Sequence, residues 1–236
     1  MVPESKALSI EAARIRDVYS RRNKNARYSA TDPGHILAVR ERETRLLALL
    51  SKHGYSSLAD TRILEIGCGT GYWLRQFVAW GARPENISGV DVLAERIKEA
   101  QHSCPAGMQL LVQNAADMSL PDGEFDLILQ STVFTSILDA NIKQRVASEM
   151  LRVLSPNGMI LWYDFCVDNP FNPDVRGVSK TEITQLFPDC RIELERLTLA
   201  PPLGRTIARM SQSMYKALSR INMLCTHYLG TISRIA

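Results

Sequence analysis

The most informative segment of the chain reads Ile63-Leu64-Glu65-Ile66-Gly67-Cys68-Gly69-Thr70-Gly71-Tyr72-Trp73-Leu74. An apolar run with one acid near its end predicts a buried parallel strand. Three glycines at alternate positions then predict a tight turn, where the backbone can approach a ligand because no Cβ is in the way. Apolar residues at helical spacing follow. The segment therefore has the strand, turn and helix that begin a doubly wound α/β domain and bind a nucleotide at the helix N-terminus.

The glycine spacing disfavours two common kinds of nucleotide site. A dinucleotide fingerprint that begins at Gly67 needs its third glycine at position 72, which is Tyr72. A phosphate-binding loop needs a lysine after its last glycine, and no lysine follows Gly71. What remains is an acid-x-G-x-G-x-G pattern that starts at Glu65. The alternative is a glycine-rich turn that binds no ligand.

This pattern resembles motif I of the class I S-adenosylmethionine-dependent methyltransferases. The resemblance implies S-adenosyl-L-methionine as the cofactor, and an acid suits position 65 because this cofactor offers an ammonium group and no phosphate. Many relatives have aspartate where this chain has Glu65. The resemblance covers residues 60 to 200. It implies an α/β fold with a doubly wound, Rossmann-like mixed sheet of seven strands, the last of them antiparallel.

Acids after two later strand-like segments complete the predicted cofactor site. Asp91 ends the segment 87–91, and one carboxylate can accept hydrogen bonds from both vicinal hydroxyls of a ribose. In the resembled family an acid after the third strand bonds the adenine amino group and the next residue packs on the ring; Asp117 and Met118 occupy these places. The predicted cofactor-binding residues are Glu65, Gly67, Cys68, Gly69, Gly71, Asp91, Val92, Arg96, Ala116, Asp117, Met118, Gln130 and Ser131.

The hydrophobic pattern and the resemblance divide the chain into four parts. We expect an N-terminal helical cap over residues 1–58, the cofactor-binding core over 59–200, a helical lid insertion over 201–224 and the last core strand over 225–236. The insertion contains an amphipathic helix from Arg205 to Ile221, with its cations on one side. This helix is either a packed surface helix or a lid over the cofactor, whose basic face meets an anionic acceptor or a membrane surface.

Composition excludes several classes of protein. A chain of 236 residues with 45% hydrophobic and 22% charged residues is ordinary for a soluble α/β protein, and a net charge of +3 does not by itself indicate nucleic-acid binding. The five cysteines show no C-x-x-C spacing, so we expect no metal site and no disulfide framework. No apolar signal-peptide core and no membrane-spanning run is present. We therefore expect a cytoplasmic protein, with peripheral contact at the inner face of the membrane as an alternative.

Several runs suggest the class of acceptor. "WYDF" (162–165), "NPFNPDVRG" (169–177), "LTLAPPLGR" (197–205) and "THYLG" (226–230) are similar to bacterial methyltransferases associated with polysaccharide and glycoconjugate gene clusters. This resemblance implies O-methylation of a sugar, glycolipid or other small-molecule hydroxyl, with a lipid-linked glycan as one candidate acceptor and no nucleic-acid partner. Residues 130–133 also lack the [DNS]-P-P-[YF] motif of amino-methylating DNA and RNA enzymes.

A hydroxyl acceptor has to lose its proton, so a general base would assist the transfer. An antiparallel last strand begins at the edge where parallel strands end, which places His227 on the ligand side and predicts that it lies near Asp164. His227 is alternatively a structural histidine. The candidate substrate-binding residues are Tyr28, Phe134, Tyr163, Asn169 and Arg176. Two other functions stay open: an RNA methyltransferase that uses the basic N-terminal segment, and a non-catalytic partner protein that binds the cofactor without turnover.

Overall fold

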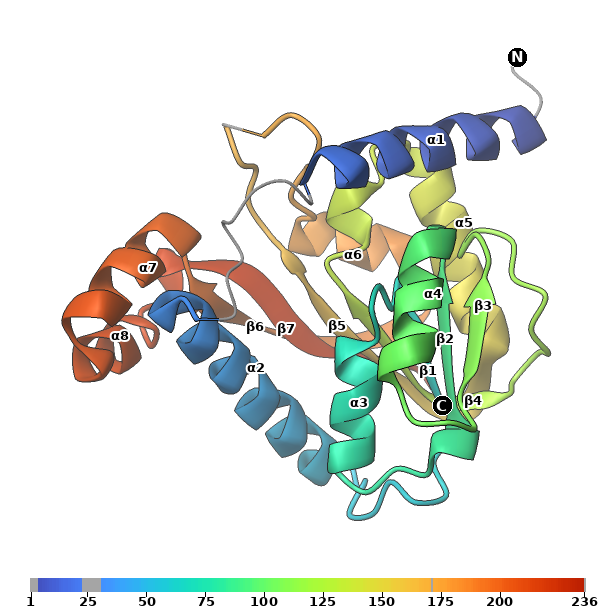
Figure 1. Ribbon diagram of the computed structural model, residues 1–236, viewed down its shortest axis with the longest axis horizontal. Helices are drawn as coiled ribbons and strands as arrows, with labels where there is room; N and C mark the ends of the chain where they lie inside the picture. Colours follow the sequence, from blue (N-terminus) through green and yellow to red (C-terminus); the bar gives the residue numbers. More distant parts are fainter. Residues whose placement is uncertain (1–3, 23–30, 171, 236) are drawn as a thin grey trace.

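The computed structural model describes residues 4–22, 31–170 and 172–235, which build a seven-stranded sheet with helices on both faces (Figure 1). The strands lie in the order β3-β2-β1-β4-β5-β7-β6. Among these strands β7 alone runs antiparallel to the other six. The predicted mixed, Rossmann-like sheet is therefore confirmed. The strands are β1 (Ile63–Ile66), β2 (Ile87–Asp91), β3 (Gln109–Val112), β4 (Phe125–Ser131), β5 (Leu154–Phe165), β6 (Cys190–Leu199) and β7 (Cys225–Arg234).

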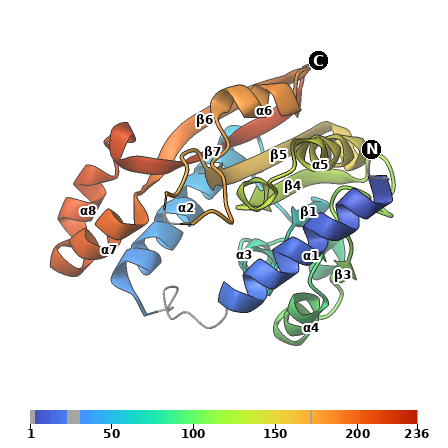
Figure 2. The same cartoon turned by 90° about the horizontal axis from the view of Figure 1, so that it is seen from above.

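The helices divide between the two faces of the sheet and its ends. One face packs against α2, α3 and α4, and the other against α5, α6 and part of α1. The helices α7 and α8 lie at one end of the sheet, whereas α1 and α4 lie toward the other end (Figures 1 and 2). The helices are α1 (Glu4–Arg22), α2 (Pro33–Lys52), α3 (Tyr72–Ala79), α4 (Ala94–Ser103), α5 (Ala140–Val153), α6 (Lys180–Leu186), α7 (Pro201–Met210) and α8 (Gln212–Leu218). Short 3-10 turns are η2 (Pro84–Asn86), η3 (Phe134–Ser136) and η4 (Asn222–Leu224).

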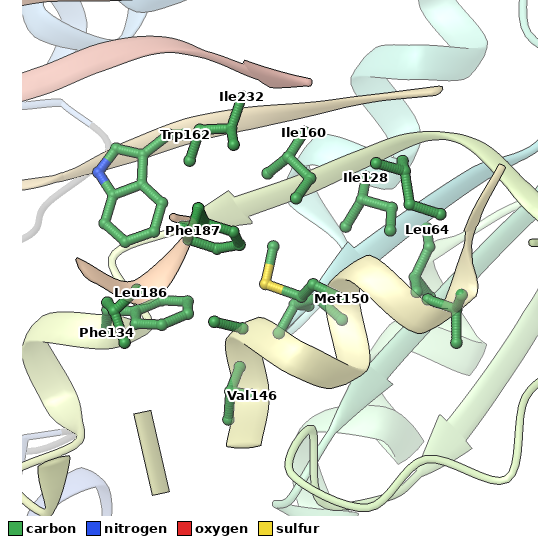
Figure 3. Close-up of a cluster of buried hydrophobic side chains, with 14 of the residues drawn as sticks. Leu64, Ile128, Phe134, Val146, Met150, Ile160, Trp162, Leu186, Phe187 and Ile232 are labelled. Atoms are coloured by element: carbon green, nitrogen blue, oxygen red, sulfur yellow. The ribbon is translucent and has the colours of Figure 1, made fainter. Parts of the chain in front are cut away.

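Alternation along the central strands sends neighbouring side chains into two separate cores. In β1, Leu64 and Ile66 enter the core beneath α5 and α6, while Ile63 enters the core beneath α2 and α3. Figure 3 shows the first of these cores, in which Trp162 and Phe187 meet edge to face with ring centroids 6.1 Å apart. Both faces of the sheet are covered, which explains why the strand segments read as continuous apolar runs.

The insertion over residues 201–224 differs from its predicted form. The expected single helix from Arg205 to Ile221 is broken at Ser211, whose backbone is extended and whose side chain accepts a hydrogen bond from the Met214 amide (3.2 Å). Ser211 thus ends α7 and caps the start of α8. The helix α7 packs against α2, where Gly34 permits contact: a Cβ at that position would lie 2.7 Å from the Arg205 Cα atom.

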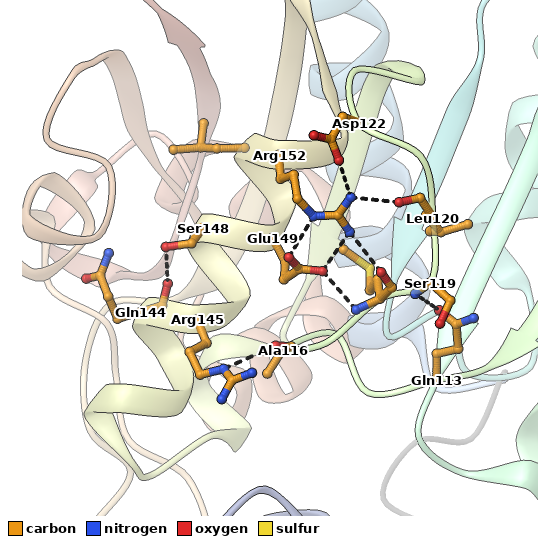
Figure 4. A network of polar contacts seen from close by, with 12 residues as sticks. Gln113, Ala116, Ser119, Leu120, Asp122, Gln144, Arg145, Ser148, Glu149 and Arg152 are labelled. Carbon is orange, nitrogen blue, oxygen red and sulfur yellow. Dashed lines mark hydrogen bonds and ion pairs between the residues drawn. The ribbon is translucent and has the colours of Figure 1, made fainter. Parts of the chain in front are cut away.

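A network around Arg152 holds the crossover between β3 and β4 against α5 (Figure 4). The Arg152 guanidinium donates to the carbonyl oxygens of Met118 (2.8 Å) and Leu120 (2.7 Å) and pairs with Glu149 and Asp122. Glu149 in turn accepts a hydrogen bond from the Met118 amide (2.8 Å). These bonds satisfy backbone groups that no strand or helix pairs, so one arginine fixes the path of the loop.

Replacing Phe187 with alanine should destabilise the protein by about 3–5 kcal/mol, because the ring is fully buried and its removal leaves a cavity between Trp162 and Phe134. Urea unfolding measures the change. Met223→Ala is the matched control, since Met223 is 92% exposed and its loss should change the free energy of unfolding by about 0.5 kcal/mol or less. Equal changes in the two variants would contradict the core position of Phe187.

Candidate functional site

A cavity of about 240 Å³ lies at the carboxyl edge of β1, β2 and β4, beneath α1. Ligands of doubly wound sheets bind at this edge, where the strand order reverses on the two sides of β1. Of the predicted cofactor-binding residues, the cavity lining includes Gly67, Asp91, Val92, Arg96 and Ser131. The structure therefore brings together residues from three strand ends that are far apart in the sequence.

The glycine turn has the backbone geometry that its sequence predicts. Gly67, Gly69 and Gly71 have φ angles of 66°, 54° and 78°, a region that favours glycine. A Cβ at Gly67 would lie 2.7 Å from Val133 Cγ2, inside van der Waals contact. Gly67 therefore keeps this wall of the cavity open and close to backbone, as a nucleotide site requires.

Asp91 joins the glycine turn to the end of β2. Its carboxylate accepts hydrogen bonds from the Gly69 amide and the Leu93 amide, each 2.9 Å long. Burial raises the pKa of Asp91 above its ordinary value, and the two amide donors oppose that shift. A carboxylate offers about four lone-pair positions. Two are used by these amides, so Asp91 can still accept hydrogen bonds from a ribose.

Glu65 carries a buried acceptor with no partner in the described structure. The residue is 2% exposed, and its Oε2 atom has no hydrogen-bond partner among the described residues. Burial and the nearby Asp91 carboxylate raise the pKa of Glu65 well above its usual range, while the charge of Arg42 opposes the shift. A buried acceptor without a donor is unfavourable. The side chain thus fits a ligand that brings an ammonium group, as S-adenosylmethionine does.

Arg42 of α2, which the sequence interpretation missed, lies beside the cavity: it contacts Ser131 of the lining but is not itself part of that lining. Its guanidinium lies over the rings of Trp73 (4.6 Å) and Tyr163 (4.4 Å), and its Nη1 atom is 3.5 Å from the Ser131 hydroxyl. Its Nε atom is buried and has no partner among the described residues. One signal was available: Arg42 is spaced four and eight residues before Leu46 and Leu50, so it shares their buried helix face.

At the end of β3 the cavity is lined by residues other than the predicted Ala116, Asp117 and Met118. Asn114 and Ala115 line it, whereas Asp117 is exposed outside the lining. Met118 is buried in the core beneath α5, with its amide held by Glu149, and Ala116 is buried beside it. The chain turns back after β3 because the Asp117 amide donates to the Asn114 carbonyl oxygen (2.9 Å), which carries Asp117 away from the cavity.

The remaining predicted cofactor residues, which include Glu65 and Gly69, are not part of the cavity lining. Cys68 is 4% exposed, and its thiol, whose pKa is raised by burial, packs in the core beneath α3. A Cβ at Gly71 would clash with the Cys104 Sγ atom. Gln130 is fully buried and accepts a hydrogen bond from the Val133 amide (3.3 Å) through Oε1. These residues shape the turns around the site from outside the lining.

The helix α1 covers the cavity. Ala12, Ile15 and Tyr19 line it from this side, and the Arg96 guanidinium lies 4.6 Å from the Tyr19 ring centroid. Glu11, which pairs with an arginine one turn later, accepts a hydrogen bond from the Leu138 amide (2.8 Å) and so fastens α1 to the loop after β4. The predicted cap over residues 1–58 thus includes a helix at the site, while the predicted lid at 201–224 packs against α2.

Thr132 is strained next to the cavity. This β-branched residue has φ of 60°, and its amide donates to the Tyr163 carbonyl oxygen (2.8 Å) immediately after β4. Such a conformation costs about 1–3 kcal/mol and persists where surrounding contacts impose it. Thr132 also lines the cavity, so the strained backbone lies in the turn after β4 that forms part of the cavity wall.

The expected pair of Asp164 and His227 does not form. Strand pairing sets His227 opposite Phe165 and Asp164 opposite Tyr228, so alternation sends the two side chains to opposite faces of the sheet. His227 is 4% exposed and stacks on Tyr163 at 4.7 Å; burial, followed by the Arg42 charge, lowers its pKa to about 3. Its imidazole is therefore neutral near pH 7, and neither residue belongs to the cavity lining.

Asp164 instead anchors the loop that follows β4. It accepts hydrogen bonds from the Thr135 amide (3.2 Å), the Thr135 hydroxyl and the Phe165 amide (2.9 Å). Complete burial raises the pKa of Asp164 to about 6 despite these donors. The same loop lines the cavity, so Asp164 acts on the site through Thr135.

The predicted substrate-binding residues do not converge on one surface. Phe134 is fully buried against Trp162, and the Tyr163 hydroxyl is buried 3.0 Å from the Thr198 hydroxyl. Asn169 and Arg176 are exposed on the loop between β5 and α6. Tyr28 lies outside the described residues.

Replacing Asp164 with asparagine should flatten the pH dependence of stability. The folded-state pKa of about 6 lies above the ordinary 3.8 of an unfolded aspartate, so the folded state holds a proton that the unfolded chain releases. The free energy of unfolding of the parent should therefore fall as pH rises from about 4 to about 7. Urea unfolding across this range should show a smaller fall for Asp164→Asn. The exposed-site control Asp60→Asn should keep the parent's slope; an equal fall in all three proteins would contradict the role of Asp164.

Comparison with known proteins agrees with this geometry. Residues 63–158 match the family model described as "Methyltransferase domain". The chain is 26% identical over 191 residues to 24-methylenesterol C-methyltransferase 2 of Oryza sativa subsp. japonica, covering 75% of this chain and 49% of that protein. It is 28% identical over 151 residues to fatty-acid O-methyltransferase of Mycolicibacterium smegmatis, covering 59% and 51%. The chain spans about half the length of the curated relatives it matches.

The fold is also similar to that of a solved methyltransferase. A crystal structure of an S-adenosylmethionine-dependent methyltransferase from Mesorhizobium loti superposes with a TM-score of 0.59 at 17% identity, covering 81% of this chain and 96% of that one. The glycine turn, the acid at the end of β2 and the unpartnered acceptor of Glu65 fit the cofactor of this class. Over residues 63–158 the chain therefore matches a methyltransferase domain, and its fold is similar to that of a solved S-adenosylmethionine-dependent methyltransferase.

Proposed function

We propose that this chain transfers a methyl group from S-adenosylmethionine to a hydroxyl of a sugar, a glycolipid or another small molecule. Binding of this cofactor is supported above all by the positions of Glu65 and Arg42. Each has a buried polar atom without a partner in the described structure, and the charge of Arg42 acts on Glu65. One acid and one cation at the end of β1 match the ammonium and carboxylate of an amino acid.

Different residues of the chain would bind different groups of the cofactor. Glu65 would hold the α-ammonium, Arg42 the α-carboxylate and Asp91 the ribose hydroxyls, while Val92, Asn114 and Ala115 would border the adenine. Bidentate geometry suits arginine to a carboxylate. The Arg42 ring contacts with Trp73 and Tyr163 hold the guanidinium in place before a ligand arrives.

The proposed catalysis rests on alignment and on exclusion of water. When bound, the cofactor supplies a methyl group on a sulfonium, which is already activated toward in-line displacement. Ile15 of α1 and Val133 of the loop after β4 give the cavity apolar walls, and α1 covers it. Holding the acceptor oxygen in line with the transferred carbon lowers the activation free energy, because the reacting atoms are already aligned.

The hydroxyl acceptor is supported by two observations. Residues 130–133 lack the motif of amino-methylating enzymes. The similar protein from M. smegmatis carries the name fatty-acid O-methyltransferase, and the rice protein is a C-methyltransferase, which makes carbon the second candidate acceptor atom. We propose Asn169 and Arg176 as acceptor-binding side chains, because they are exposed polar groups on a loop that Arg14 of α1 contacts through the Asp174 carbonyl oxygen (3.5 Å).

A turnover assay tests the proposed function and separates the alternatives. Production of S-adenosylhomocysteine from S-adenosylmethionine is measured with lipid-linked sugars, free glycans, fatty acids and RNA as acceptors. Turnover with a hydroxyl compound is the expected result. Turnover that requires RNA would establish the RNA methyltransferase instead, and cofactor binding without turnover on any acceptor would indicate the non-catalytic partner protein.

Replacing Arg42 with glutamine should weaken binding of S-adenosylmethionine at least about tenfold, since a hydrogen bond to a charged group contributes about 1.5–3 kcal/mol. Titration calorimetry measures the affinity. Arg45→Gln is the matched control, because Arg45 lies on α2 but pairs with Glu195 at the surface.

The same titration with 5′-methylthioadenosine shows which part of the cofactor Arg42 binds. This ligand has the nucleoside and the sulfur but lacks the amino-acid portion, so Arg42→Gln should bind it as the parent does. Asp91→Ala should weaken both ligands because its ribose contacts are shared. An equal loss for both ligands in Arg42→Gln would place Arg42 away from the carboxylate.

General-base catalysis by His227 stays a prediction, but the pH dependence expected of turnover changes. Because the pKa of His227 is about 3, its imidazole is neutral throughout the neutral range, and turnover should show no inflection from it near pH 6.5. If His227 takes the proton, His227→Gln should lower kcat by about 10²–10⁴ and leave cofactor affinity intact. His102→Gln, at an exposed position of α4, is the control. An unchanged kcat in His227→Gln would make the residue structural.

A further inference from the structure

The end of the molecule formed by α7, α8 and η4 exposes large apolar side chains beside cations. We name this surface the α7–α8 face and define it by six exposed residues: Met210, Met214, Lys216, Arg220, Ile221 and Met223. Met223 is 92% exposed and Met210 70%. Single exposed apolar residues are normal, but here four lie within fourteen positions of the chain, on the end formed by α7 and α8 that projects in Figures 1 and 2.

The segment that forms this face carries charges of one sign. From Arg196 to the end of the chain there is no aspartate or glutamate, and the cations are Arg196, Arg205, Arg209, Lys216, Arg220 and Arg234. Arg209 pairs with Asp32 beside α2 (2.9 Å). Within the described residues neither Lys216 nor Arg220 is in a salt bridge. Two cations of the face are therefore available to an anionic partner.

We propose that the α7–α8 face binds the surface of an anionic lipid bilayer. Flexible methionines and Ile221 can insert at the boundary of headgroups and acyl chains, while Lys216 and Arg220 approach the anionic headgroups. A second copy of the same face would bring like charges together, and a nucleic acid would leave the methionines in water. No helix in the described part of the chain is long and apolar enough to cross a bilayer, so the contact is a surface one.

The position of the face relates it to the cavity. The insertion leaves the sheet after Leu199 of β6 and returns at Cys225 of β7, a residue paired with it. Because β7 is antiparallel, this junction lies at the carboxyl edge of β5, the edge where the cavity opens among β1, β2 and β4. Bilayer binding at this edge would bring a membrane-held acceptor to the same side of the sheet. The binding itself does not depend on the proposed activity.

Cosedimentation of the full chain with vesicles tests the proposal. The vesicles are phosphatidylcholine alone and phosphatidylcholine with phosphatidylglycerol, at low and at high salt. The parent should bind the anionic vesicles at least about tenfold more tightly than the neutral ones, and high salt should weaken the binding. Lys216→Gln with Arg220→Gln should weaken it about tenfold or more. Met210→Gln with Met223→Gln should remove the binding that remains at high salt.

Matched variants control for total charge and apolarity. Lys98→Gln with Lys180→Gln removes the same charge from exposed positions of α4 and α6, and Val112→Gln changes an apolar residue of β3 that is 52% exposed. Both should bind as the parent does, and thermal unfolding checks that every variant is folded. The proposal is overturned if the folded parent does not bind anionic vesicles, if the α7–α8 variants match the controls, or if an RNA oligonucleotide binds this face while vesicles do not.

Discussion

The hydrogen bond from the Gly69 amide to the Asp91 carboxylate is the contact on which the site depends. It joins the turn after β1 to the end of β2, and the other carboxylate oxygen accepts from the Leu93 amide. One buried acid thereby holds two loops that arise from adjacent strands. The three glycines of the turn have no side chains to pack, so an acceptor from outside the turn helps to define its shape.

Alternation along the strands assigns different roles to the two faces of the sheet at this edge. On the face of α2 and α3 lie Glu65, Tyr163 and His227, together with the Arg42 guanidinium. Asp164 points to the face of α5 and α6, where it holds Thr135. The first face holds buried charged groups at the strand ends, and the second supports the loop that crosses them. A single-residue difference in position therefore separates the Tyr163 side chain, beside Arg42, from the Asp164 side chain, which holds the loop.

The two N-terminal helices serve the site in different ways. The helix α2 inserts one cation between Trp73 and Tyr163, where aromatic faces hold it without neutralising it. The helix α1 lies across the cavity and is fastened by Glu11 to the Leu138 amide. Because α1 covers the cavity, the strands of the core do not have to deviate from a regular sheet to enclose it. It also means that one wall of the cavity is held by contacts outside the core.

The sequence by itself determined the sheet, the glycine turn and the acid after β2, because these follow from periodicity and from local backbone demands at Gly67, Gly69 and Asp91. It could not show that Asp117 turns away from the cavity, since that follows from the turn closed by the Asp117 and Asn114 backbone groups and from the Arg152 network that holds the next residues against α5. It could not separate Asp164 from His227, because their faces follow from the register between β5 and β7. Arg42 entered the site only through the packing of α2 on the sheet. Local patterns fix what a segment forms, whereas contacts between distant segments decide which side chains meet.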